Sequence, residues 1–241
     1  MSDMVLIPEY VAPVGPMFQR LPVEITLKII EQLVLVGPRY KPQAIDQKRF
    51  GILNAFGSFI KMRSINKTFC QWIMEVFYHN NDFLFKHITV CNWKSWCETA
   101  LGPCLPPTWV RGFLRRITVH ICLEDNYRIL TPHDANNPSG PSTITPGTIG
   151  SVEDLYRYCP GARVLRDLTD ASKGFSNLNT LHICLYTNFN AGHDQKTLDI
   201  IRQAGFRVRA RDSVTIEVLK HPDGRKLCQQ VADLIEIELG E

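Results

Sequence analysis

The chain has 241 residues, of which 44% are hydrophobic and 21% charged, with a formal net charge of +3. These values are typical of an ordinary globular protein that buries a core without disulfides. The small net charge gives no indication of nucleic-acid binding. No apolar run reaches the roughly 18–20 residues that a membrane span needs, so we expect no membrane partner.

The first 17 residues contain Pro8, Pro13 and Pro16 and lack the basic start of a signal peptide. We therefore predict an N-terminal tail over 1–17 and a location in the cytoplasm, the nucleus or both. Eight cysteines are scattered along the chain without a C-x-x-C pair. In a reducing compartment such cysteines are usually small buried hydrophobic residues.

Residues 22–36 are predicted to form an amphipathic helix. Pro22 suits its first position, and Glu24 places a carboxylate in the first turn, where the helix dipole favours it. Gly37-Pro38 ends the helix. The apolar stripe consists of Ile25, Ile29, Ile30, Leu33 and Val34, and apolar residues continue round the helix at Leu27, Leu35 and Val36. One packed face does not need so many, which favours a helix covered by another protein over one that packs only on its own domain.

The segment 51–80 is also helical in period and divides into two stretches near Ser64 or Asn66, either of which can cap the second. The apolar positions of the first are Ile52, Phe56, Phe59, Ile60 and Met62, and those of the second are Phe69, Trp72, Ile73, Val76 and Phe77. Together with the first helix they predict a compact helical unit over 18–80, which is small for a free-standing domain.

These two elements resemble the F-box family, which begins with Leu-Pro-x-Glu before an Ile/Leu-rich helix and ends with x-R-x-V-[NS]-[KR]-x-[FW]. The matching residues are Leu21, Pro22, Val23, Glu24, Ile25, Ile29, Leu33, Leu53, Arg63, Ile65, Asn66, Lys67 and Phe69. Where the family has a short loop, this chain has an insertion at 37–50, and loops tolerate insertions at low entropic cost. The resemblance implies a source among filamentous fungi, where divergent F-box-like proteins of this kind are familiar.

The resemblance implies a non-enzymatic adaptor that joins a protein substrate to a cullin–RING (SCF-type) ubiquitin ligase through the Skp-type adaptor. The implied contacts with that adaptor are Leu21, Pro22, Ile25, Ile29, Leu33, Ile65 and Phe69. For Ile29, Ile65 and Phe69 the alternative is a place in the core of the unit. The alternative functions are an F-box-derived interaction scaffold without ligase attachment and, more remotely, an enzyme. We expect no cofactor.

From residue 83 to 241 strand-like and helix-like segments alternate, which predicts an α+β or α/β region with parallel strands and crossover helices. The expected strands are 86–91, 115–123, 178–185 and 212–219, and the expected helices are 92–101, 151–160, 195–205 and 223–237. The near copies "VHICL" and "LHICL" suggest an irregular leucine-rich-repeat-like region. Residues 131–150, rich in Pro, Gly, Ser and Thr, are predicted to form a flexible loop.

Two short motifs in this region remain open in meaning. His120 and Cys122 share one strand face, as do His182 and Cys184, so four zinc-type ligands converge if these strands are neighbours. The simpler interpretation, which we adopt, is a repeated strand with buried cysteines and no metal. Arg207, Arg209 and Arg211 share one side of a strand, either as a solvated edge or as a contact for an acidic partner or RNA. No catalytic motif is found in the sequence.

Overall fold

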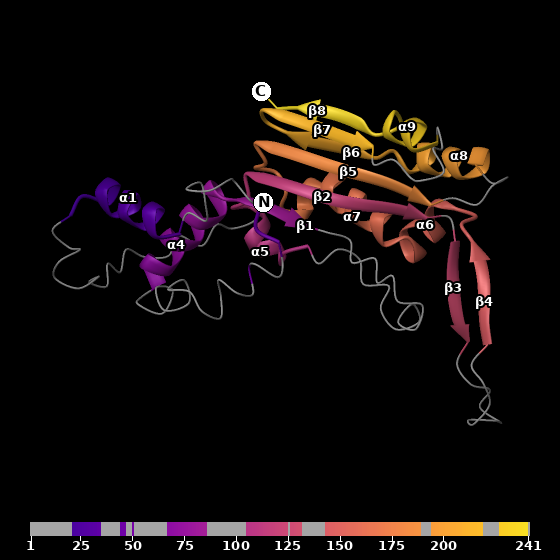
Figure 1. Ribbon diagram of the computed structural model, residues 1–241, viewed down its shortest axis with the longest axis horizontal. Coiled ribbons are helices and arrows are strands. Elements are labelled where there is room, and N and C mark those ends of the chain that lie inside the picture. Colours follow the sequence, from indigo (N-terminus) through magenta and orange to yellow (C-terminus); the bar gives the residue numbers. More distant parts are fainter. Residues whose placement is uncertain are drawn as a thin grey trace. The chain divides into compact units, whose positions relative to one another are not determined.

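The computed structural model describes residues 21–34, 44–46, 50, 67–85, 105–124, 126–131, 143–188, 194–218 and 227–240. The chain divides into two compact units, unit 1 (Met1–Asp82) and unit 2 (Phe83–Glu241). Figure 1 shows the elements in sequence colours. The predicted strand 86–91, the predicted helix 92–101 and the predicted helical stretch 51–66 lie outside the described residues. None of the helices in the described ranges has the length and apolar character needed to cross a bilayer.

Unit 1 is built on the packed pair α1 (Val23–Val34) and α4 (Lys67–Asn80). The carbonyl of Pro22 accepts from the N–H groups of Ile25 and Thr26, both at 3.1 Å. Pro22 is therefore the N-cap residue of α1, which begins at Val23, whereas the sequence predicts Pro22 as the first residue of the helix. At the other end, the side-chain amide of Asn81 donates to the carbonyls of Val34 at 3.2 Å and Phe77 at 2.9 Å, which ties the last turns of the two helices together.

Apolar side chains from both helices form the core of unit 1. These buried residues are Ile30, Val34, Phe69, Ile73, Met74, Val76, Phe77 and Tyr78. The rings of Phe77 and Tyr78 pack edge to face with centroids 5.1 Å apart. Ile45, which is also buried, donates its N–H to the carbonyl of Asp82 at 2.7 Å.

Unit 2 centres on a sheet of four strands in the order β1 (Asp82–Phe85), β2 (Arg116–Glu124), β5 (Thr180–Asn188) and β7 (Ser213–Val218). β5 pairs in parallel with β2 on one side and with β7 on the other. The predicted strands 115–123, 178–185 and 212–219 are confirmed, and so is the mixed helix and strand class with a parallel sheet. β1 was not predicted.

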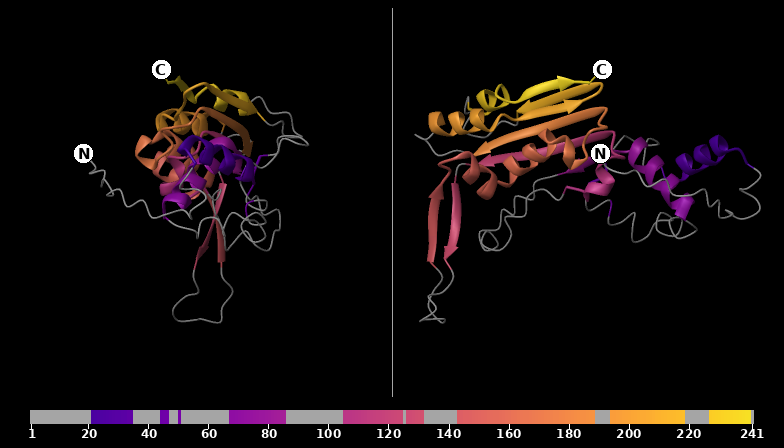
Figure 2. Two further views of the ribbon diagram at one scale, coloured as in Figure 1. Left: turned by 90° about the vertical axis from the view of Figure 1, so that its left-hand side faces the viewer. Right: turned by 180° about the vertical axis from the view of Figure 1, so that it is seen from behind.

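One face of this sheet packs against helices. Its buried residues are Ile117, Val119, Ile121 and Leu123 on β2 and Leu181, Ile183 and Leu185 on β5. α7 (Pro160–Thr169) packs on β2 and α9 (Leu227–Ala232) packs on β5 and β7, with α6 (Val152–Tyr158) and α8 (Asp194–Ala204) between them. These helices lie behind the strands in Figure 1 and in front of them in the right-hand view of Figure 2. α6 and α8 confirm the predicted helices 151–160 and 195–205, whereas α7 was not predicted.

Two predictions for unit 2 are wrong. The expected loop over 131–150 contains strand β4 (Thr143–Thr148), which pairs antiparallel with β3 (Asn126–Thr131). The β-branched Thr-Ile-Thr run favours a strand, and Pro146 is tolerated because β4 has only one partner. The expected helix over 223–237 ends at Ala232, and its last residues form β8 (Glu236–Leu239), parallel to β6 (Arg207–Ala210).

Candidate functional sites

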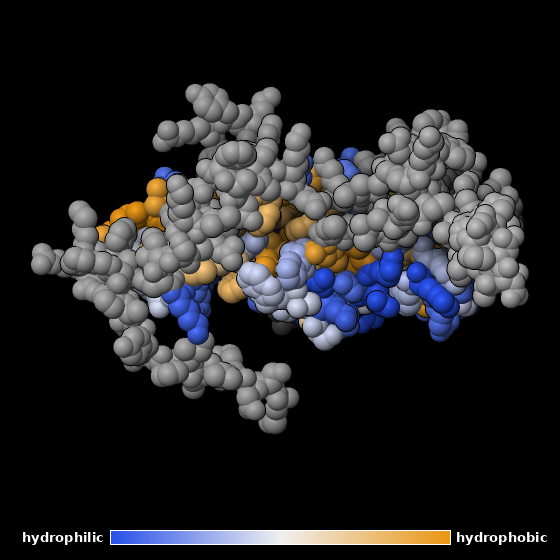
Figure 3. Space-filling view, turned by 90° about the horizontal axis from the view of Figure 1, so that it is seen from below, coloured by the Kyte–Doolittle hydropathy of each residue, from blue (hydrophilic) through white to orange (hydrophobic). Residues whose placement is uncertain are grey.

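Helix α1 carries two adjacent apolar faces, of which only one is buried. Thr26, Ile30 and Val34 form the face against α4, and they are at most 4% exposed. Ile25 and Leu33 lie one residue before Thr26 and Val34, about 100° round the helix, and are 43% and 58% exposed. We call Leu21, Pro22, Ile25 and Leu33 the exposed stripe. Hydrophobic surface at the α1 end is visible in Figure 3.

The seven residues predicted to contact an adaptor divide into three groups. Leu21, Pro22, Ile25 and Leu33 are exposed. Ile29 is half-buried between Ile25 and Leu33, four residues from each, and Phe69 lies in the core of unit 1 at 3% exposure. Ile65 lies outside the described residues. Leu21, Pro22, Ile25 and Leu33 are thus placed where a partner can reach them, while Phe69 supports the unit from within. Val23 is an exposed residue that the sequence prediction did not include.

Apolar side chains grouped on one helix surface favour association with another protein. A monomer exposes single apolar residues at little cost, but contiguous ones mark interaction sites. Grooves in partner proteins bind helices whose apolar residues recur every three or four positions, and Pro22, Ile25, Ile29 and Leu33 are spaced three, four and four residues apart. The polar residues Glu24, Lys28 and Gln32 occupy other exposed positions of the same helix. The geometry therefore defines a surface of limited width bordered by polar residues.

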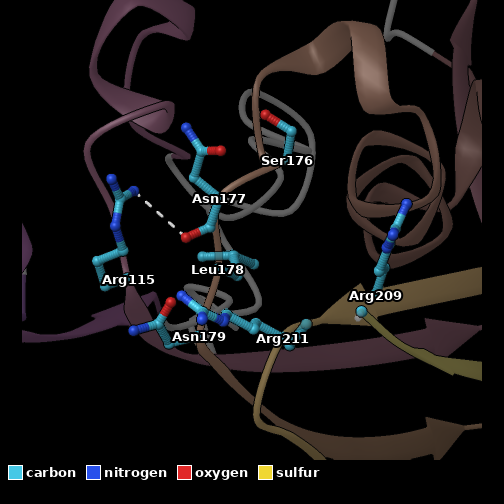
Figure 4. Close-up of a pocket in the computed structure, with 9 residues that line it drawn as sticks. Arg115, Ser176, Asn177, Leu178, Asn179, Arg209 and Arg211 are labelled. Atoms are coloured by element: carbon cyan, nitrogen blue, oxygen red, sulfur yellow. Dashed lines mark hydrogen bonds between the residues drawn. The ribbon is translucent and has the colours of Figure 1, made fainter.

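A second candidate site is an arginine-rich hollow of about 360 Å³ on unit 2. It is lined by Arg115 before β2, by the segment leading into β5, and by Arg209 and Arg211 (Figure 4). Arg115 is held by the carbonyls of Gly112, Leu114 and Asn177, with Nη1 at 2.9, 3.2 and 3.3 Å. The cationic lining suits an anionic group such as a carboxylate or phosphate.

The predicted stripe of three arginines is divided by the fold. Arg207 pairs with Glu236 at 2.9 Å and with Glu238 at 3.2 Å, both on the neighbouring strand β8. Arg211 has a weaker ion pair, 4.0 Å from Asp212. The charge of Arg207 is therefore balanced within unit 2, and of these three arginines only Arg209 and Arg211 line the hollow.

A third candidate lies on the sheet face opposite the helices. His182 Nε2 is 3.2 Å from Glu217 Oε2, and Cys184 Sγ is 3.9 Å from each of these atoms. The register explains the grouping, because β7 pairs Glu217 with Cys184 and the pleat puts His182 on the same face. In the described part of the chain, these three residues form one group able to hold a metal ion. We call them the His-Cys-Glu cluster.

The strands do not bring together the four zinc-type ligands that were considered from the sequence. β2 and β5 are neighbours, but His120 pairs with Cys184 and Cys122 pairs with Tyr186, so the two His-Cys motifs are offset by two residues. The Cys122 thiol instead donates to Glu124 at 3.3 Å. The sequence did not predict Glu217 as a ligand, because nothing in "SVTIEV" shows which residue of another strand lies beside it. The expectation that no metal binds is revised below.

Three of the cysteines described in unit 2, Cys122, Cys159 and Cys184, are poorly suited to nucleophilic chemistry. Burial, followed by the nearby Glu124 carboxylate, strongly raises the pKa of Cys122, and burial also raises the pKa of Cys159. The pKa of Cys184 is raised by burial and then by the negative charge of Glu217. The thiolate is the reactive form, so raised pKa values leave these groups as inert thiols near neutral pH.

Comparison with known proteins gives no match: no protein-family model matches the chain, no curated protein matches its sequence and no solved structure matches its fold.

Proposed function

We propose that the protein is an F-box-like adaptor that recruits a protein substrate to a cullin–RING (SCF-type) ubiquitin ligase through the Skp-type adaptor. The observation that carries the proposal is the exposed stripe of α1, which includes Leu21, Pro22 and Ile25 of the Leu21-Pro22-Val23-Glu24-Ile25 element. Thr26, Ile30 and Val34 already fill the face packed on α4, so the packing of that face does not account for the apolar residues Ile25 and Leu33.

Within this proposal the residues have different tasks. Leu21, Pro22, Ile25 and Leu33 are the anchors that enter the partner's groove. Phe69 holds α4 against α1, so it presents the surface without touching the partner. Fully burying a large aliphatic side chain contributes roughly 1.5–3 kcal/mol. Since the anchors are already about half covered, we expect roughly 1 kcal/mol from each, concentrated in a few central positions.

Unit 2 is assigned to substrate binding as an irregular leucine-rich-repeat-like region. This assignment is supported by strand order, because β1, β2, β5 and β7 follow one another in the sheet in the order in which they occur in the chain. It is also supported by the helices, which cover one face of the sheet. The other face carries partly or fully exposed polar side chains such as Thr118 and Thr215, which suit contact with a protein.

The test is co-purification of the full-length chain with a Skp-type adaptor, using single charged substitutions on α1. Ile25→Asp and Leu33→Asp place a carboxylate in an apolar contact, and we expect each to weaken capture by tenfold or more. Gln32→Asp is the matched control, because Gln32 is exposed on the same helix and gains the same charge. We expect its complex to remain intact.

Three results separate the proposal from its alternatives. No complex with the adaptor, or a complex that survives both Ile25→Asp and Leu33→Asp, refutes it. A complex that forms but fails to bring down cullin favours the interaction scaffold without ligase attachment. Circular dichroism of each variant establishes that the fold is retained, which we expect because the substituted side chains are exposed.

A further inference from the structure

We propose that the His-Cys-Glu cluster of unit 2 is a zinc site, in which His182, Cys184 and Glu217 supply three ligands and water supplies the fourth. The residue types are those that Zn²⁺ takes in proteins: an imidazole nitrogen, a thiolate sulfur and a carboxylate oxygen. No part of this inference depends on adaptor binding, since the cluster and the exposed stripe lie in different units.

The distances within the cluster are close to those of a tetrahedral site. Zinc bonds of about 2.0–2.1 Å to nitrogen and oxygen and about 2.3 Å to sulfur place N and O roughly 3.3 Å apart, and S roughly 3.6 Å from each. The corresponding distances are 3.2 Å between His182 and Glu217, and 3.9 Å from Cys184 to either partner. Shifts of a few tenths of an ångström in side-chain position bring all three atoms within bonding distance of one ion.

The backbone holds these ligands in place before an ion arrives. His182 and Cys184 occupy alternate positions of β5, the strand flanked by β2 and β7 in the parallel sheet, and Glu217 is fixed by the pairing of β5 with β7. Between them Ile183, completely buried, anchors the strand to the helix layer on the opposite face. A preorganised set of ligands loses little entropy on binding, which favours affinity.

Charge also favours a divalent cation at this position. Cys184 becomes a thiolate when it coordinates a metal ion, which places its negative charge 3.9 Å from the carboxylate oxygen of Glu217. An ion with two positive charges balances both, and coordination deprotonates the thiol. The side chains of His182 and Glu217 are 35% and 55% exposed, so an ion can enter from solvent and one coordination position remains accessible to water.

The test is metal binding by the full-length chain after removal of metal with a chelator. We expect one equivalent of Zn²⁺ in competition with a chromophoric chelator, and one equivalent of Co²⁺ giving visible bands of four-coordinate cobalt with a thiolate charge-transfer band. Cys184→Ser removes the charge-transfer band. His182→Ala and Glu217→Gln each weaken Zn²⁺ binding by roughly tenfold or more, because losing even an outer partner of a ligand costs 10–100-fold.

Controls and a second readout keep the outcome decisive. Cys70→Ser and His79→Ala alter the same residue types on α4 of unit 1, and are expected to leave the metal titration unchanged. Zn²⁺ is expected to raise the Tm of the wild-type chain but not that of Glu217→Gln, whose exposed and nearly isosteric change preserves the fold. The inference is overturned if the wild-type chain binds less than one equivalent, or if the thiolate band persists in Cys184→Ser.

Discussion

The two faces of α1 give the sharpest prediction about unit 1, because the isoleucines Ile30 and Ile25 lie on different faces. Ile30 is completely buried against α4, and Ile25 is 43% exposed. Truncating a buried isoleucine to alanine costs about 2–5 kcal/mol, through lost transfer energy and the cavity left behind. Since no part of the Ile30 side chain reaches solvent, we expect Ile30→Ala to cost about 3 kcal/mol or more.

The same substitution at Ile25 has a much smaller expected cost. Only about half of its surface is withdrawn from water, and no closed cavity forms at a position open to solvent. Alanine also has the higher helix propensity, by a fraction of the roughly 0.7 kcal/mol that separates ordinary residues. We therefore expect Ile25→Ala to change the stability of unit 1 by less than about 1 kcal/mol.

Native-state hydrogen exchange of the full-length chain, read by peptide, measures both effects. Exchange of peptides covering α1 and α4 reports unit 1, while peptides covering β2 and β5 report unit 2 and serve as the internal control. We expect Ile30→Ala to speed exchange in α1 and α4 by a factor of 100 or more, and Ile25→Ala to leave it nearly unchanged. Equal effects of the two substitutions would show that Ile25 is covered within the chain, and the exposed stripe would then not exist.

Two further predictions concern the packing of unit 2. An added Cβ at Gly161 would lie 2.0 Å from the Cys122 carbonyl oxygen, so Gly161→Ala must push α7 away from β2. We expect this substitution to lower the free energy of unfolding, measured by urea denaturation, by about 1–3 kcal/mol or more. Gly112→Ala is the control, because a Cβ there has no atom within 4 Å, and we expect it to change the free energy of unfolding by no more than about 0.5 kcal/mol. Arg111 is buried, with Nη1 3.1 Å from Asp167 Oδ2 and Cζ 4.8 Å from the centroid of the Phe175 ring. We expect Arg111→Met to lower the free energy of unfolding by about 3–5 kcal/mol, because Asp167 loses its cation. Adding Asp167→Asn should recover part of that loss, and a double variant no more stable than Arg111→Met would contradict this reasoning.

Several elements were readable from the sequence because local pattern and tertiary environment agree there. The alternation in "RITVHICL" and "TLHICL" gives strands with one buried face, and β2 and β5 have that face. The hairpin β3–β4 and the strand β8 were missed for the opposite reason. Pro146 and Gly147 are turn-forming residues by local preference, and "ADLIEI" continues a helical pattern, yet pairing with β3 and β6 overrides both.

The sequence by itself determined the apolar excess of α1, the N-terminal element that resembles an F-box, and the period of the central strands. These properties depend on neighbouring residues, which the chain order states directly. Only the tertiary structure decided which apolar face of α1 is left exposed, and that Glu217 rather than Cys122 meets His182 and Cys184. Strand order and register join residues far apart in the chain, and a shift of one residue would turn Glu217 to the other face.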